Sequence, residues 1–458
     1  MHCSVVIPCW NGAALTRACI LSLLQQVPEP PAEILVVDNA STDETPHLGD
    51  MHPSVRVLRQ PRNLGFAGGV NVGLRAATGD TVLVLNNDTQ AAPDLLLELH
   101  RQLRANPGVG AVAPVSNHVK GRARIDVGDA GRTMAARIAL SAELAQGPAF
   151  QDVDTLAGLC LLAQRTTFAA IGGFDERFGH GNFEDDDWCL RARLHGLRLG
   201  IARRAFLHHE GHATFQALGL DLRHELDKRR AQFEAKWRHD PAGLAHLAAW
   251  RGDLASAADA ARVARSRWPM WLDADWHLAR WHLANGEPAT AAAHLKAVLR
   301  ACPHHVEARL ALGQCQLDLG DTMAGQATLA TAERGPLDDG QRRTLHLILG
   351  NHAFRRGAFA EARQHYAATL AQFPDDGDAH NGIGLCLLGT GDATAARPHF
   401  VRATTHGCAP AHTNLGICQV KSGELDAARS SFARAVELLP HDLQARANLA
   451  AVAQFVAT

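Results

Sequence analysis

Residues 33–43 read Glu33-Ile34-Leu35-Val36-Val37-Asp38-Asn39-Ala40-Ser41-Thr42-Asp43, and their pattern decides the fold. A run of branched apolar residues is typical of a buried strand, and the polar residues that follow at once are typical of a loop. The pattern recurs, predicting strands at Ser4–Ile7, Glu33–Val37, Val55–Leu58, Thr81–Leu85 and Val109–Ala113. Helical stretches near 13–25, 43–50, 66–77 and 93–105 alternate with these strands. The alternation predicts an α/β domain with a parallel sheet.

Polar clusters follow four of the predicted strands at their carboxyl ends. They occupy residues 8–12, 38–43, 63–71 and 86–89 and are rich in Asn, Asp, Ser and Gly. One such cluster alone is typical of an ordinary βα turn. Four at the same edge of a parallel sheet favour a nucleotide site, because ligands bind at that edge. The glycines do not form the Gly-x-Gly-x-x-Gly pattern, so a nicotinamide cofactor is not supported.

An acidic stretch, Gly181-Asn182-Phe183-Glu184-Asp185-Asp186-Asp187-Trp188, stands where a loop meets a predicted helix. Asn182 is a suitable N-cap, and the helix dipole favours acids in a first turn, so a purely structural explanation exists. Around it we predict a strand at Leu156–Leu162, a helix near 165–171 and a strand at Leu199–Ala202. Residues 117–154 have a weak pattern, and the basic run at 120–124 is interpreted as an irregular excursion or an acceptor-side loop.

The composition is that of an ordinary soluble protein of 458 residues with a formal net charge of -2. This balance gives no electrostatic reason to expect nucleic acid or an anionic membrane as a partner. The ten cysteines are scattered without a Cys-x-x-Cys pair, which favours reduced thiols. The N-terminus enters a predicted strand at once, and no apolar run approaches the roughly 20 residues of a membrane helix. We therefore expect a cytoplasmic protein without a membrane span.

Beyond Asp240-Pro241 the chain becomes alanine-rich, helical and repetitive. Glycines followed by an acid or a small residue recur 32 to 37 residues apart, at Gly252, Gly286, Gly320, Gly357, Gly391 and Gly423. A period near 34 with alanine at close-packing positions such as Ala362 resembles tetratricopeptide repeats. We expect a domain at 1–240, ending in a helical linker over about 221–240, and an all-α solenoid at 241–458. Gln444–Val456 is the expected capping helix.

Two of the loops carry residues suited to a nucleotide and a cation. Asp38 ends a strand and is suited to accept hydrogen bonds from a base or ribose, although it is equally suited to cap the next helix. Asp88 suits a hard divalent cation that takes its other ligands from water and a diphosphate, although a polar turn after a buried strand explains it equally well. Three histidines at 208, 209 and 212 offer one further contact to such a site. Their spacing does not match the zinc-protease pattern, and the chain has no P-loop or Gly-x-Ser-x-Gly elbow.

Taken together, the motifs resemble those of family 2 glycosyltransferases, and most closely their rhamnosyltransferase-like branch. The resemblance covers about residues 3–215 and rests on the order and spacing of the motifs, which are Ser4–Asn11, Val36–Asp43, Asn63-Leu64-Gly65 with Gly69 and Asn71, Leu85–Asp88, Gly172–Glu176 and Glu184-Asp185. It implies a GT-A fold, which is a Rossmann-like nucleotide-diphospho-sugar transferase domain. It also implies inverting transfer from a nucleotide sugar with Mg²⁺ or Mn²⁺.

The resemblance also implies roles for individual residues. Asp185 matches the catalytic base, Asp38 the nucleobase contact and Asp88 the metal ligand. His208 matches a further metal ligand, and His209 and His212 are the alternatives for that place. The implied nucleotide-binding set is Pro8, Asn11, Asp38, Asn39, Asn63, Gly65, Asn71 and Asn87. The acceptor-side candidates are Glu184, Asp187 and Trp188, which leaves Asp186 as the solvated acid of the run.

Two positions depart from the family pattern. Asn86 stands where many members have the first Asp of Asp-x-Asp, which removes one charge from the metal side. Asp186 stands where an apolar residue is usual, which places the local packing of that turn in question. Neither departure removes the expected base or the expected metal carboxylate.

The sequence therefore predicts a metal-dependent glycosyltransferase that moves a sugar to an acceptor hydroxyl. Stacked helix pairs form a concave surface suited to extended peptides, so the repeats are expected to recruit a protein acceptor or partner. One alternative is a glycan or lipid-linked acceptor, with the repeats used for oligomerisation. Another is a non-catalytic adaptor with a lapsed transferase domain. The intact Asp38, Asp88 and Asp185 argue against the adaptor.

Overall fold

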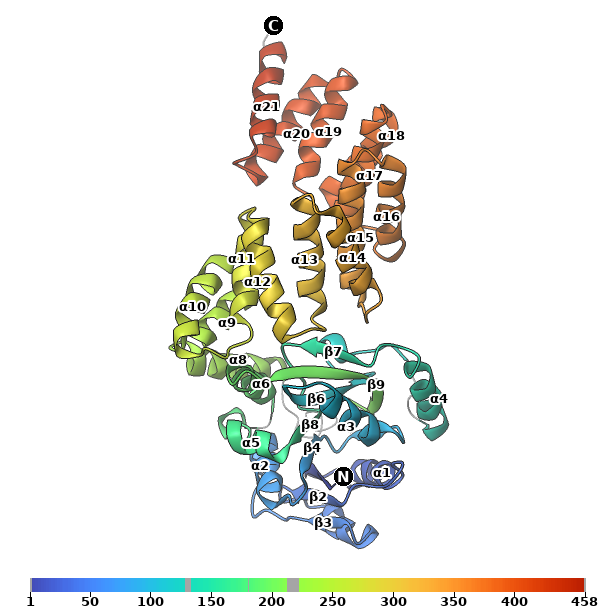
Figure 1. The fold of residues 1–458 in the computed structure, drawn as a ribbon, viewed down its shortest axis with the longest axis vertical. Helices are drawn as coiled ribbons and strands as arrows, with labels where there is room; N and C mark the ends of the chain where they lie inside the picture. The colour runs from blue at the N-terminus through green and yellow to red at the C-terminus, as the bar shows by residue number, and fades with distance from the viewer. Residues whose placement is uncertain (1, 128–132, 180, 212–221, 457–458) are drawn as a thin grey trace. The chain divides into compact units, whose positions relative to one another are not determined.

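The computed structural model describes residues 2–127, 133–179, 181–211 and 222–456 (Figure 1). The chain divides into two compact units, residues 1–315 and residues 316–458. The first unit contains the sheet together with helices up to residue 315, so it extends well past the expected boundary at 240. The boundary between the independently folding domains stays a prediction.

A mixed nine-stranded sheet forms the centre of the first unit. Its strands are β1 (Cys3–Cys9), β2 (Glu33–Asp38), β3 (Val55–Val57), β4 (Thr81–Leu85), β5 (Thr89–Ala91), β6 (Val109–Ser116), β7 (Phe150–Val153), β8 (Cys160–Gln164) and β9 (Arg198–His209). Their order is β3-β2-β1-β4-β8-β6-β9-β5, with β7 paired to β9. The neighbours from β3 to β4 are parallel, whereas β8 runs antiparallel to β4. The carboxyl ends of β1, β2 and β4 therefore meet at one edge.

Helices cover both faces of the sheet. Those around the sheet are α1 (Ala13–Leu24), α2 (Gly65–Ala76), α3 (Leu95–Ala105), α4 (Met134–Leu144), α5 (Arg165–Ile171) and α6 (Glu184–Leu194). One core joins α1 and α3 to a sheet face, and a second core joins α2, α5 and α6 to the other face. The strands in the middle are buried on both faces, which explains why β1 and β2 read as continuous apolar runs rather than alternating ones.

The glycine-rich start of α2 brings that helix unusually close to the sheet. A Cβ at Gly73 would lie 2.2 Å from a Val6 side-chain carbon, and one at Gly69 would lie 3.0 Å from Pro8 and from Asn39. Gly69 and Gly73 therefore allow helix and strand to pack.

A third core continues from the sheet region into the first helices that follow it. Here α8 (Leu222–Trp237), α9 (Pro241–Trp250), α10 (Leu254–Arg267) and α11 (Ala274–Ala284) pack with α6 through buried side chains, including Leu190, Leu194, Phe233, Trp237, Ala261 and Trp271. Alanine lets these helices approach closely, and the aromatic rings fill the space between them. Because this core is shared, the sheet and these helices belong to one compact unit.

The rest of the chain consists of antiparallel helix pairs. They are α12 (Pro288–Ala301), α13 (Val306–Asp318), α14 (Thr322–Glu333), α15 (Asp339–Arg355), α16 (Phe359–Gln372), α17 (Gly377–Gly389), α18 (Ala393–Thr405), α19 (Pro410–Lys421), α20 (Leu425–Leu438) and α21 (Leu443–Val456). The six predicted turn glycines lie between paired helices with φ from 70° to 90°, the left-handed region that favours glycine. No helix in the described part of the chain is long and apolar enough to cross a membrane.

Several predicted elements differ from those observed. The segment 43–50 forms a 3₁₀ helix, Thr45–Met51, because the Asp43 side chain accepts from Thr45 N–H and fixes a tight turn. The strand expected at 156–162 begins only at Cys160, so residues 154–159 form a loop. The weakly patterned region 117–154 contains α4 and β7. All ten cysteines are described, buried and outside any disulfide, as expected.

Gly73→Ala tests the close approach of α2. The added methyl group would collide with Val6 in a fully buried strand, so we expect a loss of about 2 kcal/mol or more in the free energy of unfolding. The matched control is Gly286→Ala, where φ is 70° and the added atom meets open space. Backbone strain alone then costs about 1 kcal/mol. Equal shifts in the urea midpoint of the two variants would contradict the packing role.

Candidate functional site

Hydrogen bonds hold the loops after β1 and β2 against each other. The backbone N–H of Asn11 donates to Ser41 Oγ at 2.8 Å, and Asn11 Oδ1 accepts from Thr42 N–H at 2.9 Å. Asp43 Oδ2 accepts from Ala13 N–H at 2.8 Å. Asn11 and Ala40 have φ of 55° and 60°, a strained conformation for residues with a Cβ. The two loops therefore form one preorganised rim at the sheet edge.

Asp38 is fully buried at the end of β2 and accepts two hydrogen bonds. One comes from Ser41 N–H and the other from the Arg59 guanidinium, each at 2.8 Å. Arg59 follows β3 and is half exposed, so this cation is the part of the pair that a ligand reaches first. The sequence analysis did not identify Arg59. Its position directly after a predicted strand, at the edge that carries the polar loops, is the feature that would have indicated it.

The remaining expected nucleotide contacts support loops. Asn39 joins its strand to the glycine turn by donating to Gly65 O, and Asn63 Oδ1 accepts from Gly65 N–H at 2.8 Å. Asn71 exchanges hydrogen bonds with the backbone of Phe174 at 2.8 and 2.9 Å. Their amide groups are engaged within the protein, and direct contact with a nucleotide stays a prediction for them.

Asn87 and Asp88 point in different directions after β4. Asn87 Nδ2 donates to Thr16 Oγ1 at 3.0 Å and lies beneath the loop that follows β1. Asp88 is 5% exposed, and its Oδ1 lies 3.3 Å from His209 Nε2. His208 Nε2 instead contacts Glu210 Oε1 at 3.2 Å. His209, rather than the expected His208, is the imidazole beside Asp88, and His212 lies outside the described residues.

The Asp88–His209 pair fits a divalent cation. The imidazole Nδ1 lies 2.6 Å from His118 O, which accepts the ring N–H and leaves Nε2 to face the Asp88 carboxylate. A metal-binding histidine in proteins usually donates its other N–H in this way. Within the residues that the structure describes, no group of three or more histidine, cysteine or acidic side chains is arranged to hold a metal. A cation here would take its other ligands from water and a diphosphate.

The backbone directly before the acidic run, where α6 begins, has an unexpected left-handed conformation. Asn182 and Phe183 have φ of 73° and 70°, and Phe183, not Asn182, is the N-cap residue. The alternative in which Asn182 caps the helix is therefore wrong, and α6 begins beside the loop at 154–159. There Gly158 N–H donates to Asp185 Oδ2 at 2.9 Å, and Asp186 N–H donates to Asp185 Oδ1 at 3.0 Å. Both oxygens of Asp185 are thereby fixed in place.

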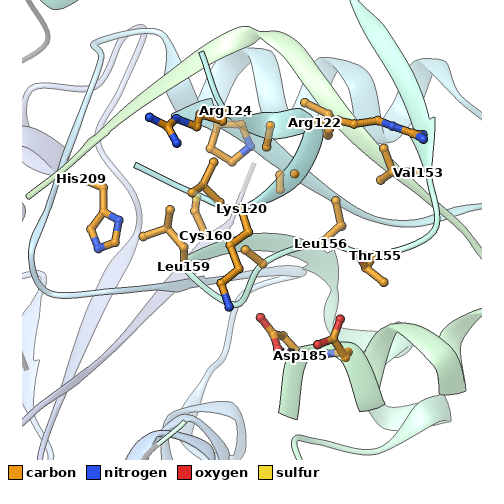
Figure 2. A pocket seen from close by; sticks show the side chains of 18 of the residues that line it. Lys120, Arg122, Arg124, Val153, Thr155, Leu156, Leu159, Cys160, Asp185 and His209 are labelled. Carbon is orange, nitrogen blue, oxygen red and sulfur yellow. Dashed lines mark hydrogen bonds between the residues drawn. The ribbon is translucent and has the colours of Figure 1, made fainter. Parts of the chain in front are cut away.

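Asp185 lines a cavity of about 620 Å³ (Figure 2). Its walls come from the end of β6 and the loop after it (113–124), the loop before β8 (153–160), the start of α6, His209 and Leu226. Figure 2 shows Lys120 reaching from the opposite wall toward Asp185. The basic run at 120–124, one interpretation of which was an acceptor-side loop, thus forms part of this cavity.

The environment raises the pKa of the acids in the cavity. Burial raises the pKa of Asp185, although backbone N–H groups and Lys120 favour its charged form. Burial and the Asp185 charge raise the pKa of Asp186 to about 7. We expected Asp186 to be the solvated acid of the run, but it is partly buried and lines the cavity. A carboxyl with a raised pKa is a stronger base when ionised, as general-base catalysis requires.

The acceptor-side candidates of the sequence analysis do not line the cavity. Asp187 is fully buried and accepts from Arg191 Nε at 2.9 Å and Trp237 Nε1 at 3.0 Å. Trp188 stacks on Phe174 and donates to Gly172 O. Glu184 is 4% exposed, and its Oε2 has no hydrogen-bond partner among the residues that the structure describes. Contact with an acceptor stays untested for these three, and the structure gives Asp187 and Trp188 roles in packing.

Comparison with known proteins connects this site to a family. The model of glycosyl transferase family 2 matches residues 4–138. A rhamnosyltransferase of Mycobacterium tuberculosis, named N-acetylglucosaminyl-diphospho-decaprenol L-rhamnosyltransferase, is 30% identical over 42% of this chain and 72% of its own length. The chain belongs to glycosyl transferase family 2. Tetratricopeptide repeat models match residues 282–345, 347–413 and 391–443 of the same chain.

Other matches to this family 2 glycosyltransferase are more partial. An uncharacterized protein of Sinorhizobium fredii is 29% identical over 55% of this chain, which spans only 30% of that relative. The O-antigen biosynthesis protein RfbC of Myxococcus xanthus is 30% identical over 45% of this chain and 17% of its own length. The solved structure of GalNAc-T7 with UDP, GalNAc and Mn2+ matches with a TM-score of 0.38 and 15% identity, covering 46% of this chain and 44% of that one. The expected fold class, a GT-A α/β domain before helical repeats, is confirmed.

Glu184→Gln tests the buried acid of the run. Burial and Asp185 raise the pKa of Glu184 well above its ordinary value. A carboxyl whose pKa is higher in the folded than in the unfolded protein contributes stability at a pH below its unfolded-state pKa. This contribution is lost as the pH rises through the folded-state pKa. We therefore expect the variant to gain stability relative to wild type as the pH rises above about 5, by on the order of 1 kcal/mol per pH unit until the pH passes the raised pKa.

Urea unfolding at each pH measures this difference. Asp259→Asn, which changes an exposed acid in α10, is the matched control and should show no such trend. A difference between Glu184→Gln and wild type that stays constant with pH would contradict the raised pKa.

Proposed function

We propose that this chain is an inverting, metal-dependent glycosyltransferase that moves a sugar from a nucleotide sugar to an acceptor hydroxyl, with Asp185 as the base. One observation carries the proposal: a single cavity is lined both by Asp185 and by His209, which contacts Asp88. A sugar between these groups would have the base on one side and the diphosphate side on the other. That arrangement is the one that inversion by direct displacement needs.

Residues of the chain account for the steps of such a transfer. The rim after β1 and β2, with Asp38 and Arg59, would hold the nucleoside. Asp185 would accept the proton of the acceptor hydroxyl as its oxygen attacks the anomeric carbon, and its two backbone hydrogen bonds keep the carboxylate aimed into the cavity. A divalent cation held by Asp88 and His209 would neutralise charge on the departing diphosphate.

The domain organisation and compartment extend the proposal. We assign the transferase domain to residues 1–240 and the repeat domain to residues 241–458, in a cytoplasmic protein. The repeats would recruit a protein acceptor or partner, since stacked helix pairs present an extended surface. A glycan or lipid-linked acceptor, with the repeats used for oligomerisation, is the alternative.

Asp185→Asn should abolish transfer while nucleotide binding remains nearly unchanged. General-base catalysis contributes about 10²- to 10⁴-fold, and the amide keeps the shape of the side chain but accepts no proton. Release of nucleoside diphosphate from a panel of nucleotide sugars measures turnover, and calorimetry measures binding. Asp259→Asn, at an exposed position of α10, is the control. Retained turnover in Asp185→Asn would refute the assignment.

Asp88→Ala should remove the stimulation of activity by Mn²⁺ or Mg²⁺. His209→Gln should share this loss, because the same pair of side chains holds the cation. His208→Gln should keep the metal dependence, since His208 contacts Glu210 instead. Titration of Mn²⁺ in the presence of nucleoside diphosphate should show at least about tenfold weaker binding in the first two variants. Unchanged metal dependence in Asp88→Ala would exclude the role.

A further inference from the structure

Two segments that line the cavity contact the first repeat helices on their far side. These cavity segments are residues 118–124, which carry Lys120 and Arg122, and residues 153–160, which carry Asp154 and Gly158. The contacts come from His305 and Glu307, at the turn between α12 and α13 and the start of α13. All of these residues belong to the first compact unit.

Arg122 connects the first cavity segment to α13. Its guanidinium forms an ion pair with Glu307 in the first turn of that helix, and both side chains are partly buried. Glu307 also lies 3.3 Å from His305 Nδ1. Because Arg122 and Lys120 belong to one short loop, the same pair restrains the ammonium group that faces Asp185.

Asp154 connects the second cavity segment to the same turn. Its carboxylate lies 3.7 Å from Arg193 and 3.8 Å from His305 Nε2. Burial acts to raise the pKa of Asp154, but Arg193, His305 and Arg122 outweigh it and lower that pKa to about 2. The segment carrying Gly158, which donates to Asp185, is thereby held by the Arg193 guanidinium of α6 and the His305 imidazole directly before α13.

Helix α6 itself is attached to α11. Arg193 lies near the end of the helix that Asp185 begins, and its guanidinium pairs with Asp273, the residue before α11. Trp271 Nε1 donates to the other oxygen of Asp273 at 3.2 Å. A fourth connection joins β7 to the turn before α13, where His304 N–H donates to Asp152 Oδ2 at 2.8 Å. Two cavity loops, α6 and β7 therefore all contact residues beyond the predicted domain boundary.

We propose that Glu307 is a positioning residue for the transfer reaction, so that the first repeat helices complete the acceptor side of the active site. This inference rests on the proposed function. Glu307 does not line the cavity. It acts through Arg122, and through Arg122 on the loop that carries Lys120. In this arrangement the repeats are part of the catalytic unit as well as a surface for partners.

The test is Glu307→Gln in the full-length chain. Loss of the ion pair should speed amide hydrogen exchange in residues 118–124 and leave exchange in α15–α21 unchanged. Turnover of nucleotide sugar with water as the acceptor should fall three- to tenfold in kcat, with the KM for the donor unchanged. Glu307→Asp, which keeps the charge, should restore at least half of the lost turnover.

The matched control is Glu234→Gln, which removes an exposed ion pair with Arg251 in the same unit. It should alter neither the exchange of residues 118–124 nor kcat. Unchanged exchange in Glu307→Gln would overturn the proposal, and so would faster exchange with unchanged kcat. If wild type turns over no nucleotide sugar, the proposed function fails, and the exchange result still decides whether Glu307 positions the loop.

Discussion

Helix α6 depends on the pairing of buried charges near both of its ends. Asp187 near its start and Arg193 near its end are almost entirely inside the protein. An unpaired charge in such surroundings costs several kcal/mol, so the groups that pair with them are obligatory parts of the structure. Lys236 and Trp237 of α8 satisfy Asp187, and Asp273 before α11 satisfies Arg193. Helix α6 is therefore held in place by segments that follow the sheet in sequence.

Four consecutive acids in one helix turn have four different environments. Successive residues of an α-helix point about 100° apart, so neighbours in sequence face different surroundings. Asp187 faces the core and its cations, Glu184 is buried without a full set of partners, and Asp185 and Asp186 face the cavity. Asp185 accepts two backbone hydrogen bonds, whereas Asp187 is held by side chains of the core. Of the two acids that face the cavity, Asp185 is thus fixed in direction by the backbone.

The sequence was sufficient to predict the alternating elements, the edge of the sheet that carries the polar loops, and the turn glycines of the repeats. These follow from local patterns: apolar periodicity, turn chemistry and the left-handed conformation. It was not sufficient to choose His209 over His208, because that choice depends on the register between β5 and β9. Nor did it indicate the roles of Arg59, Gly158 and Glu307, whose partners lie far away in the chain. Asp186 was predicted to be solvated because the local sequence carries no information about the loop that forms the opposite wall of the cavity.

The ion pairs with Asp273 and Glu307 can form only late in synthesis, because these residues follow the sheet in the chain. A ribosome adds roughly 5–20 residues each second, so the sheet is complete in sequence several seconds before its last supporting side chain is made. During that interval Arg122 lacks Glu307, and Arg193 lacks Asp273 and has only Asp154 beside it. The nascent sheet then exposes cationic groups beside an unfinished cavity. For this chain, the Arg122–Glu307 ion pair can form only after the start of α13 has been synthesised.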